Sequence, residues 1–127
     1  MSDRYMQGLQ VMESVLGETG KKIVENIAQS SEEMARLYVE VPFTDIYSRG
    51  ILDYKTRELI AVAALTCIGD SEPQLESHIL GAIHVGCTQD EIKEAILQMS
   101  VFAGFPKAIN SLTVAKKVFT NQKEQQL

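Results

Sequence analysis

The sequence contains only two cysteines, Cys67 and Cys87, and they do not form a Cys-x-x-Cys pair. This argues against a disulfide framework and against a zinc site. The chain also lacks a basic excess: its net charge is −5, whereas binding to nucleic acid requires a clustered basic surface. No apolar run is long enough to span a membrane, and the N-terminus lacks the basic-then-apolar order of a signal peptide. We therefore expect a reduced, cytoplasmic protein with no nucleic-acid or membrane partner.

Alternation of apolar and polar residues, the pattern of β-strands, is also missing, whereas apolar residues recur every three or four positions along most of the chain. The 127 residues suffice for one domain with a core of its own. We therefore expect an all-α fold of about seven helices in a single domain, 1–127, with its core in 30–120. The expected helices cover 5–16, 21–29, 31–41 with its continuation 43–49 beyond a kink or stop at Pro42, 55–68, 71–86, 88–104 and 106–120. Residues from Asn121 on are expected to fray.

The helix at 55–68 is the most apolar one. Residues 59–65 leave it no polar face, so it is expected to be buried on nearly all sides. A domain of this size can hardly enclose such a helix, which predicts that a partner subunit covers part of it. Three capping boxes are expected at helix starts: one within Ser30-Ser31-Glu32-Glu33, one of Ser71 with Gln74, and one of Thr88 with Glu91.

Chemically, the most distinctive feature is a polar stripe on the helix at 71–86. Ser71, Gln74 and His78 share one side of a helix that is otherwise built for burial. An imidazole in such a place is either a group that exchanges protons or a hydrogen-bonded residue at an oligomer interface. By the same reasoning Arg57 and Glu58 form either part of a site or a salt-bridged surface pair.

Four motifs are spread along the chain: Leu52-Asp-Tyr-Lys-Thr-Arg57-Glu-Leu-Ile60, Glu76-x-His78-x-x-Gly81-Ala82, Gly86-x-Thr88-x-x-Glu91-Ile92 and Val101-Phe-Ala-Gly-Phe-Pro106. Together with Gly8-Leu-Gln-Val, Val15-Leu-Gly17 and Tyr47-Ser-Arg49, they resemble the carboxymuconolactone decarboxylase family. That resemblance implies the all-α fold shared with alkylhydroperoxidase D and assembly into a homotrimer or homohexamer. The peroxidase branch carries Cys-x-x-Cys-x-x-x-His, and here Ser71 and Gln74 stand where its cysteines would be. The chain therefore resembles the decarboxylase branch.

The resemblance also implies roles for particular residues. His78 would be the acid that returns a proton to carbon, Arg57 or Arg49 would hold the substrate carboxylate, and Glu58 would orient or charge the imidazole. The residues expected to bind the substrate together with Arg49 are Tyr47, Gln74, Gln98 and Phe102. Gln98 stands where a histidine is usual and Tyr47 where a tryptophan is usual, so the substrate is left open. No metal or cofactor is expected.

These observations predict a cofactor-free decarboxylase acting on a carboxylated lactone or a related β-oxo acid. Two alternatives stay open. One is an alkylhydroperoxidase-like oxidoreductase using Cys67 or Cys87, although Cys67 is expected to be an inert core thiol and Cys87 to be exposed. The other is a non-catalytic oligomeric binding protein that keeps the fold.

Overall fold

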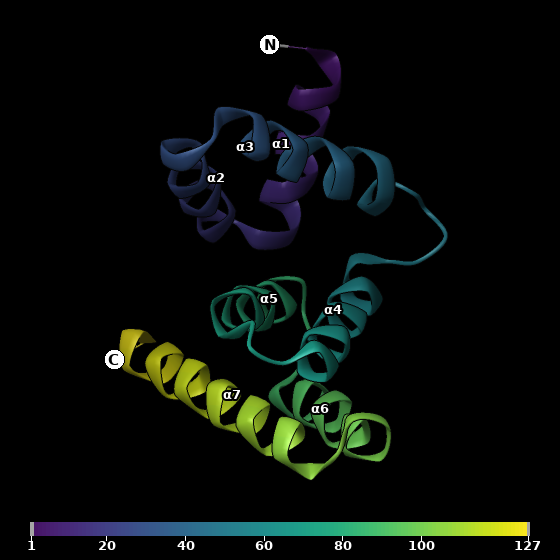
Figure 1. The fold of residues 1–127 in the computed structure, drawn as a ribbon, viewed down its shortest axis with the longest axis vertical. Helices are drawn as coiled ribbons and strands as arrows, with labels where there is room; N and C mark the ends of the chain where they lie inside the picture. The colour runs from purple at the N-terminus through teal and green to yellow at the C-terminus, as the bar shows by residue number, and fades with distance from the viewer. Residues whose placement is uncertain (1, 127) are drawn as a thin grey trace. The chain divides into compact units, whose positions relative to one another are not determined.

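The computed structural model describes residues 2–126, and all regular structure in that range is helical. The predicted all-α class is confirmed, with seven α-helices and one π-helical segment. None of the helices between residues 2 and 126 combines the length and the apolar character needed to cross a membrane. In chain order the elements are α1 (Asp3–Leu16), α2 (Glu18–Ser30), α3 (Glu32–Val39), the π-helical η1 (Glu40–Tyr47), α4 (Tyr54–Ile68), α5 (Glu72–His84), α6 (Gln89–Ala103) and α7 (Phe105–Gln126). Figure 1 labels the α-helices.

The chain divides into two compact units, Met1–Tyr54 and Lys55–Leu127. In the N-terminal unit, α1 packs against η1, and α2 packs against α3. Gly8 permits the close approach of α1 to the end of α3 and to η1, because a Cβ at this position would lie 2.6 Å from Thr44 Oγ1 and 2.7 Å from the Val39 carbonyl oxygen. Arg4 joins the same elements through ion pairs to Glu40 at 3.2 Å and to Asp45 at 2.6 Å. The buried apolar residues of this unit are Met12, Val15, Leu16, Ala35, Val39 and Phe43.

Pro42 changes the winding of the helix but does not end it. The α-helical turns of α3 stop at Val39, and the chain continues through Pro42 as the π-helix η1 up to Tyr47. Proline lacks an N–H donor, and its ring crowds the carbonyl group four residues earlier. A wider turn accommodates both effects, which explains a π-helical segment at this position.

In the C-terminal unit, α7 runs beside α5 and α6 (Figure 1). Its side chains meet those of α5 and α6 in one core, to which α4 contributes the fully buried Val62. The expectation that residues from Asn121 on fray is wrong, because α7 continues to Gln126. The other core residues are Leu75, Ile79, Ala82, Cys87, Ile92, Ile96, Ala108, Val114, Ala115, Val118 and Phe119.

Burial of α4 is restricted to one face. Within this chain its buried residues form a single stripe, Glu58, Val62 and Thr66, spaced four apart. Ile60 and Ile68 are 52% and 65% exposed. The chain by itself therefore does not bury α4 on nearly all sides, as expected for a domain too small to enclose it. Coverage of the exposed side by a partner subunit stays a prediction.

Of the three expected capping boxes, the one at Thr88 forms. The Thr88 hydroxyl accepts from the Glu91 N–H at 3.0 Å, and the Glu91 carboxylate accepts from the Thr88 N–H at 2.9 Å. At the start of α3, Ser31 caps the helix by its hydroxyl alone, which accepts from the Met34 N–H at 3.0 Å. Ser71 occupies the capping position of α5, but its hydroxyl donates to the Gly69 carbonyl oxygen at 3.1 Å. A box with Gln74 is therefore wrong. The ψ angle of Ser71 is 44°, far from the extended backbone of a capping residue, and Pro73 has no N–H that the Ser71 hydroxyl could accept from.

Candidate active site

The site is built on a hydrogen bond between α4 and α5. Glu58 lies at the head of the buried stripe of α4, and His78 lies beside the core residue Ile79 on α5. The His78 Nδ1 and Glu58 Oε2 atoms are 2.9 Å apart. The Glu58 side chain is 0% exposed, whereas that of His78 is 20% exposed. The interpretation of Glu58 as half of a surface salt bridge is therefore wrong.

A buried carboxylate requires partners, because moving an unpaired charge out of water costs several kcal/mol, roughly. The His78 ring is one such partner, and the bond also fixes the ring. With Nδ1 turned to Glu58, Nε2 is the nitrogen left to exchange a proton with a bound molecule. Among residues 2–126, no hydrogen-bond partner holds this second nitrogen. A carboxylate that orients a histidine through one nitrogen while the other does the chemistry is a recurrent catalytic arrangement.

Glu58 and His78 are thus two of the predicted catalytic residues that the structure brings into contact. The third, Arg57, is half-buried and precedes Glu58 on α4. Gln74 is exposed and lies about one turn before His78 on α5.

The other predicted binding residues lie on different elements. Gln98 and Phe102 belong to the exposed side of α6, where Phe102 is 72% exposed. Tyr47 ends η1, and its ring packs on that of Phe43 with centroids 5.3 Å apart. Arg49 follows in the same N-terminal unit, and its backbone N–H donates to the Ile46 carbonyl oxygen at 3.1 Å.

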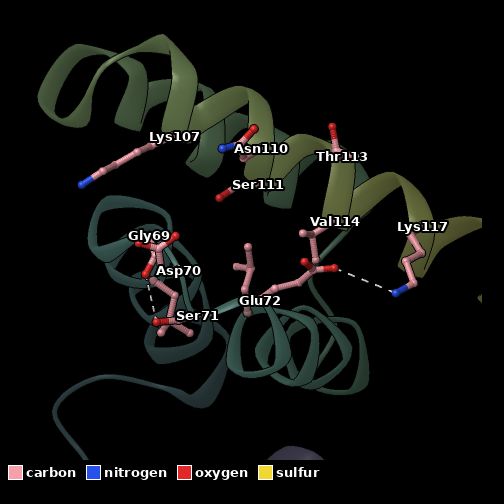
Figure 2. Close-up of a pocket in the computed structure, with 12 residues that line it drawn as sticks. Gly69, Asp70, Ser71, Glu72, Lys107, Asn110, Ser111, Thr113, Val114 and Lys117 are labelled. Atoms are coloured by element: carbon pink, nitrogen blue, oxygen red, sulfur yellow. Dashed lines mark hydrogen bonds and ion pairs between the residues drawn. The ribbon is translucent and has the colours of Figure 1, made fainter.

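A hollow of about 530 Å³ opens between the start of α5 and the middle of α7. Figure 2 shows Asn110, Ser111 and Val114 of α7 across from Gly69 and Glu72. The charges around it are mixed and partly paired. Lys117 Nζ lies 4.0 Å from Glu72 Oε1, and Lys107 Nζ donates to the Cys67 carbonyl oxygen at 3.0 Å. Neither His78 nor Glu58 lines this hollow.

Comparison with known proteins decides the family. Residues 32–117 match the carboxymuconolactone decarboxylase family, a range that includes α4, α5 and the Glu58–His78 pair. The chain belongs to this family. A 4-carboxymuconolactone decarboxylase from Acinetobacter baylyi is 33% identical over 117 residues, which cover 91% of this chain and 87% of the relative. The resemblance inferred from the motifs is therefore confirmed.

Two further relatives of this family member are similarly distant. The nitrosuccinic acid decarboxylase npaB of Metarhizium robertsii is 30% identical over 122 residues, covering 92% of this chain and 82% of the relative. An uncharacterized 15.0 kDa protein of Paracoccus denitrificans is 31% identical over 129 residues, covering 83% of this chain and 96% of the relative. Two of these relatives are thus named for decarboxylation of different compounds.

The cysteines of this family member are placed the other way round from the prediction. Cys87, expected to be exposed, is 6% exposed and belongs to the apolar core, where its Sγ lies 3.6 Å from the Lys55 carbonyl oxygen. Cys67, expected to be a core thiol, is half-buried. It follows Thr66 and so falls beside the buried stripe of α4. A thiol enclosed by apolar side chains is a poor nucleophile, so the position of Cys87 offers the peroxidase alternative no support.

Proposed function

We propose that this family member is a cofactor-free decarboxylase in which His78 is the proton donor. The observation that carries the proposal is the hydrogen bond between His78 Nδ1 and the fully buried Glu58 carboxylate. The named activities of two relatives, on 4-carboxymuconolactone and on nitrosuccinic acid, point to the same class of reaction. The proposed substrate is a carboxylated lactone or a related β-oxo acid.

The two named substrates share an electronic requirement. When carbon dioxide leaves, the electron pair of the broken carbon–carbon bond stays on the substrate, and a conjugated lactone carbonyl or a nitro group can take it. An enolate-like oxygen then carries the charge until carbon is protonated. In the proposal His78 supplies that proton from Nε2, and Glu58 on Nδ1 compensates the charge of the ring while it is protonated. Water returns the proton to His78 after product release.

In the proposal, substrate binding falls to the arginines and to the polar and aromatic residues that the family resemblance indicates. Arg57, next to Glu58 on α4, or Arg49 holds the carboxylate, because a guanidinium matches its planar geometry. Tyr47, Gln74, Gln98 and Phe102 complete the proposed binding set. The glutamine at position 98 would offer an amide where relatives of the decarboxylase branch are expected to offer an imidazole.

We also propose that the chain assembles into a homotrimer or homohexamer in the cytoplasm. The support is an apolar surface where α6 meets α7: Val101 is 79% exposed and Phe105 is 69% exposed. Large apolar side chains exposed on two consecutive helices favour a protein–protein interface, because monomeric proteins rarely expose large apolar patches. The other exposed apolar residues on these two helices are Leu97, Phe102 and Ile109.

The test compares two histidines on one helix. Decarboxylation of 4-carboxymuconolactone and of nitrosuccinate is followed by carbon dioxide release for the parent, His78→Ala and His84→Ala. His84 is exposed at the end of α5, so its variant is the matched control. We expect His78→Ala to lose on the order of 100-fold in kcat or more, as for removal of a general acid, and His84→Ala to keep the parental rate. Equal rates in the two variants would contradict the proposal, as would a parent protein that releases no carbon dioxide from either compound.

A further inference from the structure

A second hollow lies at the other end of α7. It measures about 850 Å³ and is lined by the end of α5, the start of α6 and the last turns of α7. Its apolar part includes Ile83, Leu112 and Phe119, and it contains neither His78 nor Glu58. The remaining lining residues are Cys87, Gln89, Lys93, Ala115, Lys116, Thr120, Gln122 and Lys123.

The charge of this lining is opposite to that of the chain. The protein carries 17 acidic and 12 basic residues, yet the hollow is lined by Lys93, Lys116 and Lys123 and by no aspartate or glutamate. None of these three lysines makes an ion pair within residues 2–126, although Lys21 and Lys55 elsewhere each pair with a glutamate. Three ammonium groups around one hollow repel each other, and a bound anion would relieve that repulsion.

Helical spacing puts the cations beside an apolar surface. Lys116, Phe119 and Lys123 share one face of α7, and the two lysines are separated by roughly 10 Å along the helix axis at 1.5 Å per residue. Lys93 reaches over from α6, with its Nζ 5.9 Å from the centre of the Phe119 ring. A ligand with an apolar body and one anionic end could therefore contact the apolar part of the hollow and a lysine at the same time.

We propose that this hollow binds a small amphipathic carboxylate, with its apolar body against Ile83, Leu112 and Phe119 and its carboxylate among the three lysines. The volume lies within the range of about 300–1,000 Å³ that is usual for small-molecule sites. A non-reacting ligand is proposed because the lining holds no histidine and its only thiol, Cys87, is buried. The site does not depend on the proposed decarboxylase reaction.

Calorimetric titration with decanoate, below its micelle-forming concentration, tests the proposal on the full chain. The parent is compared with a triple variant, Lys93→Gln, Lys116→Gln and Lys123→Gln, and with Lys117→Gln as the matched control. Lys117 is next to Lys116 but lines the other hollow. We expect the triple variant to bind at least about tenfold more weakly, as for loss of charge-assisted hydrogen bonds, and the control to stay within about twofold of the parent. Far-UV circular dichroism verifies that each variant is folded.

Two further measurements leave the three lysines unchanged. Decyltrimethylammonium, which has the same chain length and the opposite charge, is expected to bind the parent at least about tenfold more weakly than decanoate does. His78→Ala is expected to bind decanoate as the parent does. The proposal is overturned if the parent does not bind decanoate, if the triple variant binds it equally well, or if the cationic ligand binds as tightly. Loss of binding in His78→Ala would place the carboxylate in the active site and overturn it too.

Discussion

The Glu58–His78 pair leads to a sharp prediction about stability. Glu58 is wholly buried, and His78 Nδ1 lies 2.9 Å from its Oε2 atom. Replacing His78 by leucine removes this partner and leaves the carboxylate enclosed. Replacing Glu58 by methionine removes the charge and fills a similar volume. The two single variants should therefore behave differently, although each breaks the same hydrogen bond.

The magnitude follows from the burial. Breaking a buried ion pair by removing one partner costs about 3–5 kcal/mol, and a hydrogen bond to a charged group contributes about 1.5–3 kcal/mol. Glu58 has further interactions and the His78 side chain is 20% exposed, so the lower part of the first range applies. We expect His78→Leu to lower the free energy of unfolding by about 3 kcal/mol. The double variant should be more stable than this single variant, with a coupling of about 2 kcal/mol between the two positions.

Urea unfolding followed by far-UV circular dichroism measures all four proteins of the cycle. One protein concentration is used throughout, because unfolding of an oligomer depends on concentration. His84→Leu, at the exposed end of the same helix, is the control and should change the unfolding free energy by less than about 0.5 kcal/mol. The reasoning is refuted if the effects of the two substitutions add to within about 0.5 kcal/mol, the behaviour of independent sites or of an exposed pair.

Three further predictions concern packing, pH and assembly. Gly8→Ala should lower stability by about 1–3 kcal/mol in thermal unfolding, since its Cβ would lie 2.6 and 2.7 Å from two oxygen atoms, whereas Gly50→Ala, with nothing within 4 Å, should not. The pKa of Glu91 is held below its usual range, first by the capping backbone N–H and then by a lysine. The ionised carboxylate therefore stabilises the fold at pH 7, and this effect is lost as the pH falls through the lowered pKa. The melting temperature of Glu91→Gln should lie below that of the parent at pH 7 and approach it in acid. A difference in melting temperature that does not change with pH would contradict this. Val101→Asp should reduce the assembly size in analytical ultracentrifugation, and a parent that already sediments as a monomer would disprove the proposed assembly.

Local patterns predicted the helices well because their start signals are local. Thr88 and Glu91 cap α6 through two bonds that involve only residues three apart. The same reasoning failed at Ser71, where the chain enters α5 from Asp70 with a φ of 51°. That left-handed residue follows from the path between α4 and α5, which the local pattern does not contain. The π-helical winding around Pro42 was likewise beyond a pattern that distinguishes only helix from break.

Burial was harder to predict, because it depends on which side of a helix meets its neighbours. All seven residues from Leu59 to Leu65 are apolar, so no polar position among them marks the outer face of α4. The inner face could therefore not be predicted from them. The face that turned inward is the one that carries Glu58, Val62 and Thr66. Cys67 and Cys87 were misassigned for the same reason, since position in or after an apolar helix does not say which way a side chain turns.

That inward face bears on function. Packing alone would favour an apolar residue at position 58, because exchanging a buried ion pair for well-packed apolar side chains is often neutral or stabilising. The rest of the stripe holds a valine and a threonine whose hydroxyl bonds to the Val62 carbonyl oxygen at 2.8 Å, so the carboxylate is the costly member. Its cost is offset in part by His78, and the pair leaves one imidazole nitrogen to exchange protons. The proposed reaction uses such a nitrogen, whereas the packing of two helices has no need of one, so the buried glutamate supports the proposed catalytic role over a purely structural one.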